Sequence, residues 1–336
     1  MFVIMGITGK VGSAVANTLL DANQPVRAIV RHTDKGKDWA QRGCEIAIAD
    51  SNDESSLKIA FKGAKGVFVM LPPTYSPSED FRETKIMVNN LYKALDEARP
   101  ERIVCLSTIG ADATQPNLLN ALQILEKGLS NLPIPIAFVR AAWFMENSAW
   151  DVDSAVKEGV IQSYLQPLDK PVPMVATADI GRVAAELLQQ SLWKSIKIIE
   201  IEGPSRVTPY DIAKTFSKLL SKEVRVEAVA RDKWESIFIA QGTTNPSPRI
   251  QMLNGFNEGW IEFQNGGASS IKGKVLLDTV IQQLLAQKQL LITQKSSTTT
   301  YASNRYLLLN QNTDKQEDES ILEEQSKQTS FKNNLL

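Results

Sequence analysis

Short apolar runs alternate with helical patterns through the first 140 residues, and this alternation constrains the fold more than any other feature of the chain. The runs that have the length and composition of strands are residues 2–5, 26–30, 44–49, 66–71, 102–107 and 133–140. The run at 66–71 is apolar without alternation, which is typical of a parallel strand covered on both faces. We therefore expect an α/β fold, with a doubly wound parallel sheet, right-handed crossovers and 66–71 near its centre.

The pattern changes after residue 140, where shorter elements suggest a smaller lobe packed on the end of the sheet. We expect a helix that begins at Asp179 and is capped by that residue. The other elements expected there are a strand at 196–201, a helix at 208–220, a strand at 224–229 and a helix at 274–285. The predicted organisation is a core at 1–144, a substrate lobe at 145–287 and a polar, disordered tail at 288–336.

Composition and charge exclude several classes of function. Lys and Arg number 37 against 38 for Asp and Glu, so no overall field attracts nucleic acid, and we expect no such partner. His32 is the single histidine, which argues against a Ser-His-Asp triad or a multi-histidine metal site. Cys44 and Cys105 lie in apolar runs, as free buried thiols do. Without a basic leader or an apolar stretch of roughly 18 residues, we expect no membrane contact and a cytoplasmic location.

A glycine turn lies between the first strand and the first helix. Gly6 suits the tight turn, Gly9 permits a close approach of a pyrophosphate, and Gly12 lets the helix pack near the strand. The free N–H groups and the positive end of the helix dipole favour an anion there. The turn therefore predicts a dinucleotide-binding Rossmann fold. The residues of the turn expected to contact the cofactor are Gly6, Thr8, Gly9, Lys10, Val11 and Gly12.

The end of the second strand indicates which dinucleotide is bound. An acidic residue there would favour NAD, but the chain has Arg31, followed by Lys35 and Lys37. A guanidinium and nearby ammonium groups suit the 2'-phosphate, so we predict NADP(H), although a solvated basic loop is the alternative for the lysines. Asp50, at the end of the third strand, either accepts a hydrogen bond from the adenine or orders the following turn.

The chain resembles the NmrA-like group of atypical short-chain dehydrogenases, which includes NAD(P)H-dependent quinone oxidoreductases of type 2. The resemblance covers residues 1–287 and rests on the segments GITGKVG, VFVMLPP, CLSTIGAD, VRAAWFMEN and TADIGRVAAELL. It implies NADP(H) bound across the strand ends, and either reduction of small electrophiles such as quinones or redox sensing without turnover. Further cofactor contacts are expected at Ser51, Met70, Leu71, Pro72, Ser107 and Lys127.

The proton relay of a typical short-chain dehydrogenase is incomplete. Such a relay uses a serine, a tyrosine and a lysine four residues after the tyrosine. Ser107 and Thr108 fit the serine position, but Gln123 stands four residues before Lys127 and cannot titrate. Quinone reduction survives this loss, because solvent can protonate a hydroquinone anion. For Lys127, an exposed helical lysine is the alternative to a contact with the ribose.

Residues past the sixth strand suggest an acceptor site. Ala141-Ala142 replaces the Pro-Gly pair common in relatives, while Trp143, Phe144 and Asn147 suit a planar acceptor and its oxygen, with Tyr75 as a cover. Packing between the lobes is the alternative for the aromatic residues, above all for Trp150.

We predict an NADPH-dependent oxidoreductase that reduces a quinone-like or other conjugated small molecule. The alternatives are an NADP(H)-sensing regulatory protein without turnover and a biosynthetic reductase or isomerase. A homodimer or a regulatory protein partner is left open.

Overall fold

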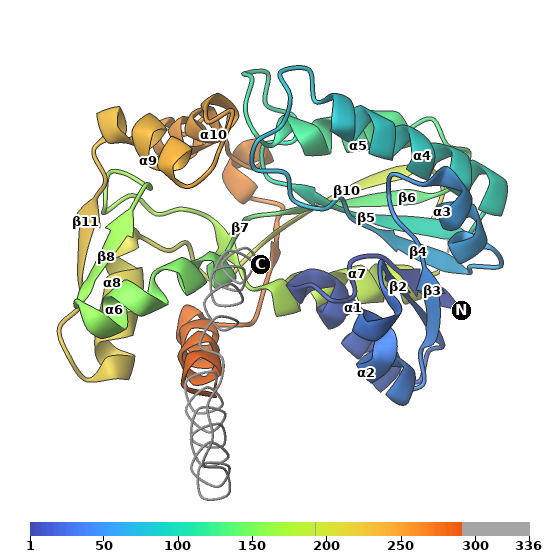
Figure 1. The fold of residues 1–336 in the computed structure, drawn as a ribbon, viewed down its shortest axis with the longest axis horizontal. Helices are drawn as coiled ribbons and strands as arrows, with labels where there is room; N and C mark the ends of the chain where they lie inside the picture. The colour runs from blue at the N-terminus through green and yellow to red at the C-terminus, as the bar shows by residue number, and fades with distance from the viewer. Residues whose placement is uncertain (192, 291–336) are drawn as a thin grey trace, which may run out of the picture. The chain divides into compact units, whose positions relative to one another are not determined.

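The computed structural model of the chain describes residues 1–191 and 193–290 and contains an eight-stranded sheet (Figure 1). Its strands are β1 (Phe2–Ile4), β2 (Val26–Val30), β3 (Glu45–Ile48), β4 (Gly66–Val69), β5 (Arg102–Thr108), β6 (Ile136–Ala141), β10 (Ile196–Glu202) and β12 (Ile271–Lys272). The strand order is β12-β10-β6-β5-β4-β1-β2-β3, and every neighbouring pair is parallel. The α/β class, the doubly wound parallel sheet and the central place of β4 are therefore confirmed.

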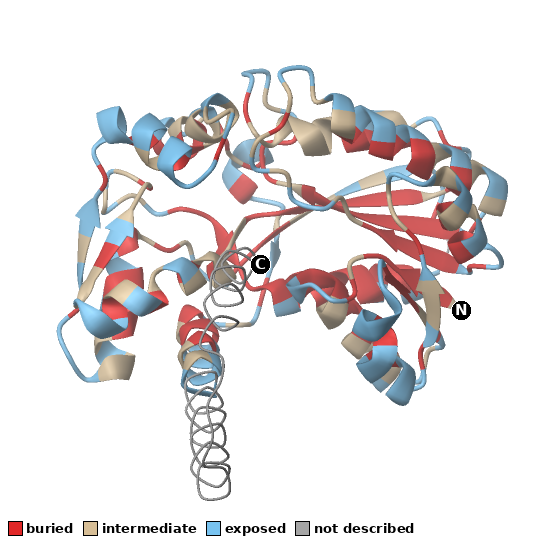
Figure 2. Cartoon of the chain, viewed as in Figure 1, coloured by how far each residue is buried: buried red, intermediate tan, exposed pale blue. Residues whose placement is uncertain are grey.

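Helices cover both faces of this sheet (Figure 1). One face carries α3 (Glu54–Phe61), α4 (Arg82–Ala98) and α5 (Asn120–Leu129), and the other carries α1 (Lys10–Asp21) and α7 (Thr177–Gln189). The short η1 (Thr33–Gly36) and α2 (Lys37–Gln41) connect β2 to β3. Figure 2 shows the central strands as buried along their length, which explains why their sequences are continuously apolar.

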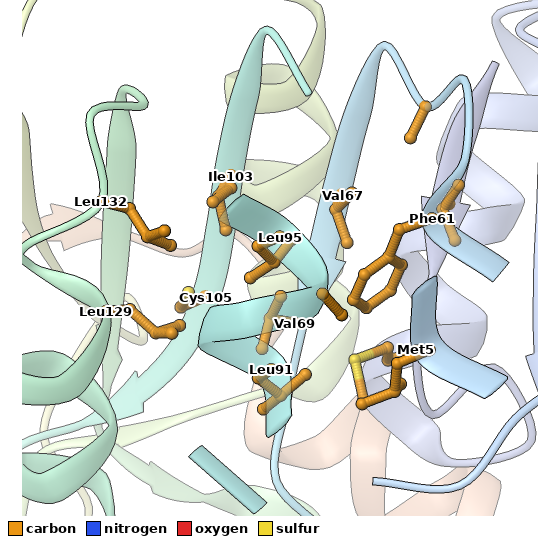
Figure 3. Close-up of a cluster of buried hydrophobic side chains, with 14 of the residues drawn as sticks. Met5, Phe61, Val67, Val69, Leu91, Leu95, Ile103, Cys105, Leu129 and Leu132 are labelled. Carbon is orange, nitrogen blue, oxygen red and sulfur yellow. The ribbon is translucent and has the colours of Figure 1, made fainter. Parts of the chain in front are cut away.

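The main core lies between the sheet and helices α3, α4 and α5. Figure 3 shows Val67, Val69 and Ile103 of the sheet against Leu91 and Leu95 of α4. Cys105 is in the same cluster, and both Cys44 and Cys105 are free and buried, as predicted. Burial raises the pKa of the Cys105 thiol well above its usual value, so the thiol stays protonated.

The second half of the chain contributes to this sheet and also forms a separate lobe. Helix α7 and strands β10 and β12 come from beyond residue 145, where the sequence predicted only the smaller lobe. The remaining elements are β7 (Trp143–Phe144), η2 (Met145–Trp150), α6 (Val152–Lys157), β8 (Val160–Ser163), β9 (Met174–Val175), α8 (Pro209–Leu220), β11 (Arg225–Ala228), η3 (Arg231–Lys233), α9 (Trp234–Ala240), α10 (Ser247–Glu258) and η4 (Gln264–Gly267). Trp234 and Phe238 are at the centre of a second apolar cluster there.

Two predictions about α7 are wrong, namely the residue at which it begins and the residue that caps it. Helix α7 begins at Thr177, and its N-terminus is capped by Glu146, whose carboxylate accepts hydrogen bonds from the backbone N–H of Thr177 at 2.9 Å and from its hydroxyl at 2.6 Å. Asp179 is instead buried in the first turn, where its Oδ2 accepts the backbone N–H groups of Lys274 and Val275, both at 2.8 Å. Asp179 therefore fixes the segment that follows β12.

The C-terminal helix begins at residue 277 rather than at 274, and residues 277–290 are helical. The tail predicted from residue 288 thus starts within a helix, and its part from 291 to 336 lies outside the described residues. Within the described chain, no helix combines the length and apolarity that crossing a membrane requires.

Candidate functional site

The turn between β1 and α1 has the shape of a phosphate cradle. Gly6 has a φ of +63°, and a Cβ there would lie 2.3 Å from the Met70 sulfur. Helix α1 starts after Gly9, with no side-chain cap and no acidic residue in its first turn. Its first N–H groups therefore have no intrahelical partners, and they suit the oxygens of a pyrophosphate.

The close approach of α1 to β1 depends on Gly12. A Cβ at this position would lie 2.2 Å from the Gly6 carbonyl oxygen and 2.8 Å from the Met5 carbonyl oxygen, both of which are backbone atoms that cannot rotate away. We predict that Gly12→Ala lowers the free energy of unfolding by about 2–3 kcal/mol, as overpacking does. Chemical denaturation followed by circular dichroism measures this loss. Gly9→Ala is the control, because its Cβ would lie 3.3 Å from the Gly6 oxygen, and equal losses in both variants would contradict the prediction.

The ends of β2 and β3 lie at the same edge of the sheet as this turn. Arg31 directly follows β2 and is exposed, and the described part of the chain offers its guanidinium neither an ion pair nor a hydrogen bond. Lys35 lies in η1 and is exposed as well. Asp50 orders the turn after β3, since its Oδ1 accepts the backbone N–H of Asn52 at 2.8 Å. The turn-ordering role of Asp50 is thus present in the structure, while a contact with the adenine stays a prediction.

The remaining predicted cofactor residues lie beside these strand ends or next to the glycine turn. Met70, Leu71 and Pro72 directly follow β4, and the Met70 side chain packs over Gly6. Ser51 precedes α3, and its carbonyl oxygen accepts a hydrogen bond from the side-chain amide of Asn90 at 3.1 Å. Thr8, Lys10 and Val11 belong to the turn and the start of α1, so the structure gathers all these residues at the carboxyl ends of the parallel strands.

Ser107 takes part in a buried polar network. Its hydroxyl donates to Glu126 of α5, and Arg140 of β6 donates to both oxygens of that carboxylate at 3.0 and 2.8 Å. Arg140 also pairs with Asp112 at 2.8 Å. The Ser107 hydroxyl is therefore engaged away from the cavity described below, which Thr108 lines instead. The sequence did not reveal this network, although two signals of it were present. Glu126 is a charge on an apolar helix face, and Arg140 is a charge at the end of a buried strand.

Lys127 and Gln123 interact with each other. The Lys127 ammonium is exposed and donates to the Gln123 side-chain oxygen at 3.2 Å, while the Gln123 amide donates to the Ala113 carbonyl at 3.3 Å. A contact between Lys127 and the ribose stays a prediction.

A cavity of about 330 Å³ brings together the four residues predicted to bind the acceptor, Tyr75, Trp143, Phe144 and Asn147. Trp150 also lines it, although most of its side chain is exposed. Trp143 packs edge-to-face on Phe256 of α10, with ring centroids 5.2 Å apart, so it contributes both to packing within the lobe and to the wall. The further apolar wall residues are Ile109, Leu118, Leu119, Ala142, Ile161, Leu165, Pro209, Ile212, Met252 and Leu253.

Two charged residues that the sequence did not single out also line this cavity, Asp151 and Arg249. Asp151 lies between η2 and α6, and the described residues offer its carboxyl no hydrogen bond or ion pair. Burial raises the pKa of Asp151 to about 7. From sequence, an aspartate just before a helix predicts a cap, so its place in the cavity could not be foreseen.

Asp151 should make stability depend on pH. Because its pKa is higher in the folded protein than in the unfolded chain, the folded state binds the extra proton, and stability is lost as the pH rises from about 4 through 7. We predict that Asp151→Asn is more stable than the wild type at pH 8, by on the order of 3 kcal/mol, and that the gap closes toward pH 4. Thermal unfolding across this range is the measurement. A gap that does not change with pH would contradict the prediction.

Comparison with known proteins places these features in a family. The model of the NmrA-like family matches residues 1–259. An NAD(P)H azoreductase of Xenophilus azovorans is 24% identical, over 72% of this chain and 82% of its own. Two solved structures have the same fold. An NADPH-dependent quinone oxidoreductase of Escherichia coli, complexed with NADPH, is 22% identical, with a TM-score of 0.69 over 84% of this chain and 99% of that one. A triphenylmethane reductase of Citrobacter, complexed with NADP(H), is 20% identical, with a TM-score of 0.70 over the same shares.

Proposed function

Since the chain belongs to the NmrA-like family, we propose that it is an NADP(H)-dependent oxidoreductase whose acceptor is a planar, conjugated small molecule. The observation that carries this proposal is the arrangement of the sheet edge. The uncapped start of α1 follows β1, and the aromatic cavity begins where β5 ends, at Thr108 and Ile109, so one ligand can extend from the first site to the second. The similar proteins named above include an azoreductase and a quinone oxidoreductase, which supports this class of acceptor.

The residues at the sheet edge fit the cofactor. The backbone N–H groups at the start of α1 would hold its pyrophosphate, and Arg31, which has no protein partner among the described residues, would hold the 2'-phosphate. When bound, NADPH supplies the hydride. The side chain of Met70, which directly follows β4, packs over Gly6 and covers the glycine turn there.

The cavity fits the acceptor. Trp143 and Phe144 offer apolar faces for a planar ring, and Asn147 offers an amide that can donate to an acceptor oxygen. Gln123 cannot supply a proton, which favours an acceptor whose reduced anion is weakly basic or is protonated from solvent. A quinone meets this condition, because the hydroquinone formed when its reduced anion is protonated has an acidity near that of a phenol.

The test is oxidation of NADPH by a panel of acceptors, namely a naphthoquinone, an enone, an imine and an azo dye, followed by absorbance. Turnover of the quinone or the azo dye supports the proposal. If NADPH binds but none of the four acceptors is reduced, the proposal fails. Gln123 at the place of the titratable tyrosine would then favour an NADP(H)-sensing regulatory protein, and capture of partner proteins with and without NADP would test that function.

A further inference from the structure

Arg249 is the one cationic residue among the described residues that line the cavity. It lies in the first turn of α10, and its guanidinium carbon is 3.9 Å from the centroid of the Phe238 ring. The wall around it is largely apolar, with Met252, Leu253 and Phe256 from the same helix. A guanidinium in such a place loses much of its hydration, which costs free energy unless an anion compensates.

The protein supplies no such anion within the part of the chain that the structure describes. Among the described residues, Arg249 donates one weak hydrogen bond, to the Gln241 side-chain oxygen at 3.3 Å, and has no carboxylate within ion-pair distance. The ionisable groups that interact with it electrostatically are the phenols of Tyr75 and Tyr164. Burial raises the pKa of Tyr164, so that phenol is neutral at neutral pH. Burial lowers the pKa of Arg249 itself, yet a guanidinium keeps its proton at any physiological pH.

The surroundings of Arg249 add to its positive potential. Helix α10 has no acidic residue in its first turn, and no described side chain caps its N-terminus, so the positive end of its dipole is not compensated by the part of the chain that the structure describes. Asp151, the one carboxyl among the described lining residues, is not paired with Arg249. The end of the cavity formed by α10 is therefore an apolar site with a fixed, unpaired positive charge.

We propose that Arg249 binds an oxyanion substituent, a carboxylate or a sulfonate, on the planar acceptor, so that the preferred substrates are anionic aromatic compounds. The planar fork of N–H donors suits two oxygens of such a group. The aromatic body of the acceptor would then lie against Trp143 and Phe144. This inference deepens the proposed function and rests on it in one respect, namely that the bound aromatic anion is the compound that is reduced. Binding of the anion to Arg249 does not itself require turnover.

The experiment compares two ligands that cannot be reduced, 2-naphthoate and 2-naphthalenemethanol, by quenching of tryptophan fluorescence in the full-length protein without cofactor. The wild type is expected to bind the carboxylate at least about tenfold more tightly than the alcohol, as a charge-assisted hydrogen-bonded pair predicts. Arg249→Leu should abolish this preference, and Arg249→Lys, which keeps the charge without the fork, should retain part of it. Arg231→Leu is the matched control, because Arg231 belongs to the same lobe but pairs with Glu258 and does not line the cavity.

The outcomes separate this inference from the proposed function. Equal binding of the two ligands by the wild type, or an unchanged preference in Arg249→Leu with native circular dichroism, would overturn the inference even if quinones are reduced. A preference that is lost in Arg249→Leu but kept in Arg231→Leu supports it, whether or not NADPH is oxidised. In turnover, the KM ratio of a naphthoquinone to its sulfonate should fall about tenfold in Arg249→Leu, with kcat little changed.

Discussion

Replacing Glu126 with leucine is expected to lower the free energy of unfolding by about 3–5 kcal/mol, because it leaves the Arg140 charge buried without its main partner. Arg140 is 6% exposed, and two of its nitrogens donate to the Glu126 carboxylate. Asp112, its other partner, has a side chain that is 44% exposed, and it can compensate the charge only in part. The Ser107 hydroxyl would lose its acceptor in the same variant.

A double variant tells whether the loss comes from the unpaired charge. Glu126→Leu with Arg140→Met removes both charges, and it should recover much of the stability, since an apolar pair of similar size often replaces a buried ion pair without loss. Urea denaturation followed by circular dichroism gives the values. Glu54→Gln is the control, because Glu54 pairs with Lys58 and Lys93 at the surface, and we expect little change there. A double variant as unstable as Glu126→Leu alone would show that the loss is one of packing.

Replacing Arg31 with aspartate is expected to weaken NADPH binding by about 30- to 100-fold, while NADH binding changes little or improves. The guanidinium would lose a charge-assisted contact with the 2'-phosphate, and a carboxylate there would repel that phosphate yet accept a hydrogen bond from a ribose hydroxyl. Arg31 has no protein partner among the described residues, so its removal should not disturb the fold. Fluorescence titration with each nucleotide measures the effect.

The control for the Arg31 variant changes the same charge elsewhere. Lys62 is exposed, and its carbonyl oxygen accepts a hydrogen bond from Arg27, near the start of β2 and thus at the other end of the strand from Arg31. Lys62→Asp should therefore leave the preference for NADPH over NADH intact. If both variants reduce NADPH binding equally, the effect is one of overall charge and Arg31 has no specific role.

Much of the fold follows from local patterns in the sequence. The strand predicted at 26–30 is β2 residue for residue, because every residue of this run except Arg27 is apolar and the run ends at the charged Arg31. The glycine turn could also be located, since the close approach of α1 to β1 at Gly12 requires a residue without a Cβ. Tyr75, Trp143, Phe144 and Asn147 come together in one cavity, as their positions after strand ends indicated.

What could not be predicted depends on residues that are distant in the chain. Glu146 caps α7 from 31 positions away, whereas local reasoning chose Asp179 for this role. Arg249 reaches the cavity wall from α10, more than a hundred residues after Trp143. Such contacts arise from packing between elements, and neither periodicity nor short motifs record them. Glu126 and Arg140 are nearer in the chain, but only the packing of α5 on β6 shows that these two charges pair with each other.

The most direct test of the central claim is one titration of the purified full-length protein with NADPH and with NADH by fluorescence, followed by addition of a naphthoquinone to the same sample. An NADP(H)-dependent oxidoreductase predicts tight NADPH binding, weaker NADH binding and rapid loss of the NADPH fluorescence when the quinone is added. Absence of NADPH binding, or an NADPH signal that stays constant with the quinone and with every other conjugated acceptor, would contradict it.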